Sequence, residues 1–94
     1  MDLPTFETFS SEAKELGFDE VIERKWPPAT VLESHTHPFS VKALVVGGEM
    51  WLTVSDDVRH LRPGDEFTLD REVPHAERYG DQGATYWVAR RHGA

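Results

Sequence analysis

The sequence contains no cysteine. This excludes a disulfide framework, a thiolate metal site and a thiol nucleophile, so any metal would need imidazole or carboxylate ligands. No apolar run approaches the length that spans a membrane, and the first residues lack the basic and apolar segments of a secretion signal. We therefore expect a cytoplasmic protein with no membrane partner.

Basic residues are also in the minority. Ten lysines and arginines stand against 17 aspartates and glutamates, which gives a net charge of −7. This charge repels the phosphate backbone, so we expect no nucleic-acid partner. The 94 residues suffice for one compact domain, and any function must be built into that single fold.

One short helix and a series of strands are predicted. The segment Phe9 to Gly17 has apolar residues at helical spacing, with Ser10 or Ser11 as its expected cap. We expect residues 1–18 to form an N-terminal extension with this helix, and residues 19–94 to form an all-β sandwich or barrel. The predicted strands, with turns at Gly47-Gly48 and Gly80 to Gly83 among others, are Glu20–Lys25, Thr30–Glu33, Val41–Val46, Glu49–Val54, Val58–Leu61, Glu66–Leu69, His75–Tyr79 and Thr85–Arg90.

A His-x-His pair lies in the segment that follows the second predicted strand. His35 and His37 are separated by one residue, so in extended chain they share a face and their Cα atoms lie about 7 Å apart. Two imidazoles at that spacing can reach one ion. Such a pair alone also occurs on exposed strand surfaces without a metal.

The spacing around this pair resembles that of the cupin family, over roughly residues 26–90. The first cupin motif has glycine, five residues, His-x-His, three or four residues, glutamate, six residues and glycine. The corresponding positions here are Ala29, His35, His37, Val41 or Lys42, and Gly48. The second motif has glycine, five residues, Pro-x-Gly, two residues, histidine, three residues and asparagine. Its corresponding positions are Gly64, Asp70, Glu72, His75 and Tyr79.

The resemblance implies a double-stranded β-helix, the jelly-roll cupin barrel. It also implies that His35, His37 and His75 hold one divalent metal in a central cavity. Iron, manganese, zinc, copper and nickel all remain open as its identity.

The glutamate ligand of the family has no counterpart in this chain, because its place is taken by Val41, or by Lys42 under the longer spacing. Two other carboxylates, Glu33 and Glu77, each lie two residues from a candidate histidine and so share its strand face. We prefer Glu77 as the substitute group, and Glu77 and Tyr79 as candidate proton carriers. A solvated strand glutamate is the alternative interpretation of Glu77.

Two functions follow from the resemblance. The first is a metal-dependent, dioxygenase-like oxidoreductase that acts on a small oxygen-containing molecule. The second is a non-catalytic or sensory module that binds a small ligand. A homodimer is expected in either case, with the outward residues Lys42, Leu44 and Val46 as a candidate patch. His60 and His92 are expected to be exposed and outside the site.

Overall fold

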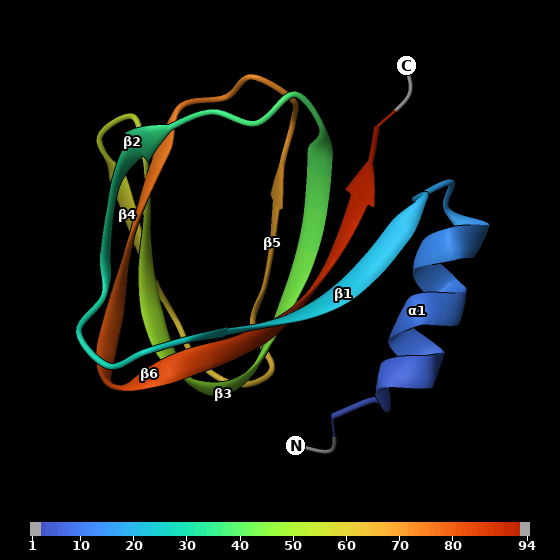
Figure 1. The fold of residues 1–94 in the computed structure, drawn as a ribbon, viewed down its shortest axis with the longest axis horizontal. Coiled ribbons are helices and arrows are strands. Elements are labelled where there is room, and N and C mark those ends of the chain that lie inside the picture. The colour runs from blue at the N-terminus through green and yellow to red at the C-terminus, as the bar shows by residue number, and fades with distance from the viewer. Residues whose placement is uncertain (1–2, 93–94) are drawn as a thin grey trace.

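The computed structural model describes residues 3–92 and shows one helix packed against a β-barrel (Figure 1). The elements are α1 (Phe6–Glu15), β1 (Glu20–Trp26), β2 (Val31–His35), β3 (Ser40–Val54), β4 (Asp57–Leu61), β5 (Glu66–Leu69) and β6 (His75–Arg91). The all-β barrel with a short N-terminal helix is thus confirmed. Within the described range, no helix is long and apolar enough to cross a membrane.

The barrel is organised by two long strands. β3 and β6 pair in antiparallel fashion from Ser40 opposite Arg91 to Thr53 opposite Ala76. At one end of this ribbon β1 adds to β6 and β5 adds to β3, which forms a wall in the order β1-β6-β3-β5. At the other end the order is β2-β6-β3-β4. We call these the β1 wall and the β2 wall, and the ribbon belongs to both (Figure 1).

The predicted turns at Gly47-Gly48 and Gly80 to Gly83 are wrong, because both segments lie inside continuous strands. The register between β3 and β6 shifts on both sides of Gly48, so the ribbon carries bulges there and passes from one wall to the other. A side chain at Gly48 would collide with the carbonyl oxygen of Gly83. The glycines therefore serve a close approach of two strands and do not end them.

Backbone conformation matches the glycine positions of the two cupin motifs. Positive φ angles occur at Ala29 (58°), Gly48 (67°), Gly64 (99°) and Glu72 (61°). These are the four residues that the spacing aligns with motif glycines. Two of them carry side chains here, at a cost of about 1–3 kcal/mol each for a non-glycine residue in this region.

The apolar core lies inside the barrel and follows the strand alternation. Met50 and Leu52 are fully buried, as their alternation with polar neighbours predicts. They pack in one cluster with inward residues of both walls, including Ala43, Phe67, Tyr79 and Val88.

Helix α1 starts earlier than predicted. It begins at Phe6, and Thr5 is its N-cap, accepting a hydrogen bond from the Thr8 amide at 3.0 Å. Ser10 and Ser11 lie inside the helix, so the predicted cap is wrong. Thr5 was not predicted as the N-cap, because the residues before it, Leu3 and Pro4, suggested an irregular N-terminal segment.

The helix covers the surface that the sequence suggested for a dimer. Phe9 and Ala13 of α1 pack on Leu44 and Ala89, and Leu44 is only 4% exposed. The prediction that Lys42, Leu44 and Val46 form a free surface patch is therefore wrong, because helix α1 of the same chain covers Leu44 at its centre. The homodimer itself stays a prediction.

The bend of the ribbon gives a test with a matched neighbour. We expect Gly48→Ala to destabilise the fold by about 3 kcal/mol or more, because it combines a positive φ with a backbone collision. Gly47→Ala should cost less than about 1 kcal/mol, since its Cβ would meet only Thr85 at 3.6 Å. Urea unfolding of both variants measures the difference, and equal stabilities would contradict the role given to Gly48.

Candidate metal centre

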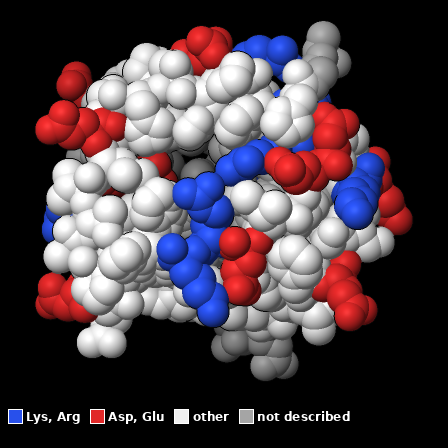
Figure 2. Space-filling view, in the orientation of Figure 1, with Lys and Arg blue, Asp and Glu red and all other residues white. Residues whose placement is uncertain are grey.

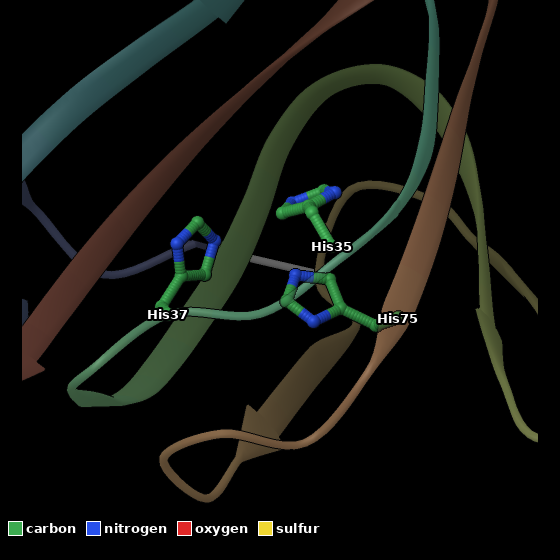
Figure 3. Close-up of side chains that lie close together, drawn as sticks. All are labelled: His35, His37 and His75. Atoms are coloured by element: carbon green, nitrogen blue, oxygen red, sulfur yellow. The ribbon is translucent and has the colours of Figure 1, made fainter.

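Three histidines converge at one end of the β2 wall (Figure 3). His35 ends β2 and His75 begins β6, and the register places them directly opposite each other. His37 lies in the connection between β2 and β3. The register shift between Leu32 and His35 is taken up in β2, so β6 keeps its alternation beyond His75.

The rings face one another closely enough to share an ion. The candidate ligand nitrogens all lie within 4.8 Å of each other. Ring centroids are 4.4 Å apart for His35 and His75, 4.9 Å for His35 and His37, and 5.1 Å for His37 and His75. The sequence prediction that these residues gather inside the barrel is confirmed.

Backbone carbonyls fix the orientation of two of the rings. Nδ1 of His35 lies 2.7 Å from the Glu33 carbonyl oxygen, and Nδ1 of His75 lies 3.0 Å from that of Val73. A carbonyl oxygen only accepts, so each Nδ1 carries the proton and donates. When the ring is neutral, Nε2 then has a free lone pair, which is the form that binds a metal.

His37 is kept neutral by its surroundings. Burial lowers the pKa of His37 below its ordinary value, and the nearby His75 and His35 shift this pKa in the same direction. Its ring stacks on Phe39 with centroids 4.9 Å apart. A neutral imidazole can coordinate a metal without first losing a proton.

Glu77 places a buried carboxylate beside two of the histidines. Its side chain is 6% exposed, and Oε2 lies 3.4 Å from Nε2 of His35 and 3.8 Å from Nε2 of His75. Two donors bound to one ion at about 2.1 Å each lie roughly 3.0–3.4 Å apart, so the observed spacing is close to that of shared ligands. The solvated-glutamate interpretation is wrong for this residue, because the unbroken alternation of β6 turns it inward.

Two tyrosines surround the same carboxylate. Tyr79 donates its hydroxyl to Oε1 of Glu77 at 2.7 Å, and this leaves Oε2 for the histidines. Burial raises the pKa of Tyr79, and it also raises the pKa of Tyr86, whose oxygen accepts from the indole of Trp26 at 3.1 Å. Both phenols therefore stay protonated at neutral pH. Of the two, Tyr86 lines the cavity described next.

A cavity of about 250 Å³ lies in front of the histidines. Most of its lining is apolar, with Leu32, Phe67 and Val88 among the contributors, and it also includes Arg24 and Arg90. Figure 2 shows basic side chains gathered beside a hollow on one face of the molecule. The two arginines were missed at the sequence level, although the alternation of β1 (Ile22, Arg24, Trp26) would have placed Arg24 inward.

The position of the missing glutamate is occupied by Val41. It lines the cavity, whereas Lys42 lies on the other face of β3 with its amino group 3.9 Å from Glu66. Three neutral imidazoles and one carboxylate form a donor set that suits zinc, iron, manganese, copper or nickel. The residues present therefore fit a divalent ion.

The remaining candidates lie outside the centre. Glu33 is exposed, because the β2 bulge turns it away from the cavity, and only its backbone carbonyl contacts a site residue. His60 is exposed as expected and pairs with Glu49 at 2.9 Å. His92 is also exposed.

Comparison with known proteins places the fold. The chain matches no protein-family model and no curated protein sequence. It is similar in structure to KdgF from Halomonas sp., with 19% identity, a TM-score of 0.70, and 79% of this chain and 68% of that chain covered. An RmlC-like cupin from Shewanella frigidimarina has 21% identity, a TM-score of 0.65 and coverages of 74% and 63%. Oxalate decarboxylase from Bacillus subtilis, a protein with Mn(II) centres, has 19% identity, a TM-score of 0.72 and coverages of 85% and 23%.

These likenesses confirm that the chain folds as a small cupin domain. It spans between 23% and 68% of the length of those three proteins. At these identities the comparison establishes the fold, and the function has to be argued from the residues of this chain.

The tautomers assigned above can be tested directly. We expect long-range ¹H–¹⁵N spectra of the metal-free protein, at about two units above the ordinary histidine pKa of about 6.5, to show the Nδ1–H form for His35 and His75. His60 is the internal control, because its Nε2 faces a carboxylate and its Nδ1 faces an arginine, which requires the Nε2–H form. An Nε2–H signal from His35 or His75 would contradict the proposed orientation of the free lone pairs.

Proposed function

We propose that this small cupin domain binds one divalent metal through His35, His37 and His75, with Glu77 as the compensating carboxylate. The loaded cavity then acts as a dioxygenase-like enzyme on a small oxygen-containing molecule. One observation carries the proposal: three imidazoles and a buried carboxylate converge on one side of a single cavity. The Mn(II) centres of a structural neighbour support it.

The charge balance favours such an ion. Glu77 is buried beside His35 and His75, and the distances of its Oε2 to both Nε2 atoms are longer than a direct hydrogen bond. A buried carboxylate is costly without a counter-charge. A divalent cation between these atoms would offset that cost, and the rings are already turned to receive it.

The protein's own groups have distinct roles in the proposed reaction. A bound divalent metal would supply Lewis acidity and a template for substrate. Tyr79 holds Oε1 of Glu77, so that Oε2 alone faces the reacting side and can hold or accept a proton. The apolar part of the lining, with Leu32, Phe67 and Val88, offers water no hydrogen-bond partners from its side chains.

Metal content is the first measurement. Protein purified without chelators should contain about one divalent metal per chain by elemental mass spectrometry, and the His35→Ala/His75→Ala variant should contain none. His92→Ala, which removes an exposed histidine outside the centre, should keep the metal.

Absence of metal after incubation with iron, manganese, zinc, copper and nickel salts would contradict the proposal. The barrel would then be better explained as a non-catalytic module that holds a small ligand. With metal bound, oxygen uptake that disappears on metal removal separates the enzyme from such a module.

The role of Glu77 has its own test. We expect Glu77→Gln to weaken metal binding by about 10–100-fold, because it removes the negative charge while keeping the shape of the side chain. Glu33→Gln is the matched control, since Glu33 also lies two residues from a candidate histidine but is exposed. Competition titration against a zinc indicator measures both affinities. Equal affinities would show that Glu77 takes no part in binding the metal.

A further inference from the structure

Two arginines occupy inward positions of the β1 wall, where core residues are expected. In β1, Arg24 lies between the inward residues Ile22 and Trp26, and in β6, Arg90 follows the inward Val88. Both arginines line the cavity that contains the histidines. A guanidinium cannot lose its charge, so its placement in a largely apolar cavity is costly without an anionic partner.

Arg90 is held in place but incompletely paired. Its Nη1 lies 3.3 Å from Glu20, and its guanidinium carbon lies 4.9 Å from the centre of the Phe39 ring. Its Nε is buried without a hydrogen-bond partner, and it is the only buried side-chain nitrogen or oxygen within residues 3–92 in that state. A fixed guanidinium with a vacant donor is a preformed site for a carboxylate or similar oxyanion.

The cross-strand neighbour of Arg90 explains this vacancy. Val41 lies directly opposite Arg90 in the register between β3 and β6. Opposed side chains of an antiparallel pair have Cβ atoms about 4.5–5.5 Å apart, so an acidic residue at this position would pair with the guanidinium. Valine cannot do so, and the pairing with Glu20, which lies opposite Arg90 on β1, engages Nη1 and leaves Nε without a partner.

Arg24 provides a second cation. Within the described residues it forms no ion pair, and its guanidinium carbon lies 4.8 Å from the centre of the Trp26 ring. The charged residues of the lining are thus two arginines and Glu77, in a protein whose net charge is −7. The cavity lining thus carries a net positive charge, whereas the molecule as a whole is negatively charged. This favours a negatively charged ligand.

We propose that the cavity binds a small organic anion, a carboxylate with a second oxygen donor, whose negative charge is balanced by Arg24 and Arg90 of the lining. In this proposal the second oxygen of the ligand faces the three histidines. That part of the inference rests on the proposed metal centre. The volume of about 250 Å³ lies below the roughly 300–1,000 Å³ of drug-sized pockets, so the ligand is a molecule of a few carbons.

Binding to zinc-loaded protein provides the test, and it needs no turnover. The probes are lactate and malate, compared with their neutral analogues lactamide and malamide, by isothermal titration calorimetry. We expect the anions to bind at least about tenfold more tightly than the amides, since the amide removes the charge and retains the shape. Arg24→Gln and Arg90→Gln should each weaken lactate binding by at least about tenfold.

Lys25→Gln is the matched control. Lys25 follows Arg24 on β1 but points outward, with 74% of its side chain exposed, so its loss removes one positive charge outside the cavity. This variant should bind lactate within about twofold of the unchanged protein, because exposed charges contribute little. Zinc content and thermal unfolding are measured for every variant, so that loss of fold or metal is recognised.

The outcomes separate the two proposals. The anion site is overturned if zinc-loaded protein binds the amides as tightly as the anions. It is also overturned if neither lactate nor malate binds with a dissociation constant below about 10 mM. Both results leave the proposed metal centre intact. If the chain binds no zinc, the same titrations on metal-free protein decide: arginine-dependent binding of lactate or malate supports the anion site alone, and its absence overturns it.

Discussion

Strands β3 and β6 hydrogen-bond to each other on both sides of a bend, and the walls of the barrel are extensions of that single ribbon. The start of β6 contributes His75 and Glu77 to the β2 wall, and its end contributes Tyr86 and Arg90 to the β1 wall. One strand therefore carries one of the three candidate histidine ligands, the candidate carboxylate and one of the two cavity arginines. Their separation depends on the bulges near Gly48, where only a residue without a side chain lets the two backbones approach.

The alternation of β6 accounts for the chemistry on its inner face. His75, Glu77 and Tyr79 are buried in succession at every second position, while Arg78 between them is exposed. A strand places such residues about 7 Å apart at Cα, within reach of one another's polar ends. The hydrogen bond from Tyr79 then selects which oxygen of Glu77 faces the histidines. The order of residues along the strand thereby places a hydrogen-bonded Tyr79–Glu77 pair beside the histidines.

Much of this arrangement was predictable from spacing. The histidine positions and the inward face of Glu77 follow from motif distances and period-two alternation, and positive φ angles at Ala29 and Glu72 fall where the motif has glycine. The continuity of β3 and β6 was not predictable, because glycine pairs signal turns and bulges alike. Leu44 was placed outward correctly, but sequence alone does not show that α1 covers it. Arg24 was overlooked because inward positions are expected to be apolar.

The departure from the family pattern at Val41 links the two halves of the cavity. A carboxylate at that position would lie opposite Arg90 in the register and would compete for its guanidinium. In this chain the carboxylate comes from β6 instead, as Glu77, beside His35 and His75. Negative charge thus lies beside the histidines, whereas Arg90 is paired with Glu20 through Nη1 alone and its Nε has no partner among the described residues. With valine at position 41 of β3 and the carboxylate of Glu77 on β6, one region of the cavity is suited to a cation and another to an anion, as the proposed bridging ligand requires.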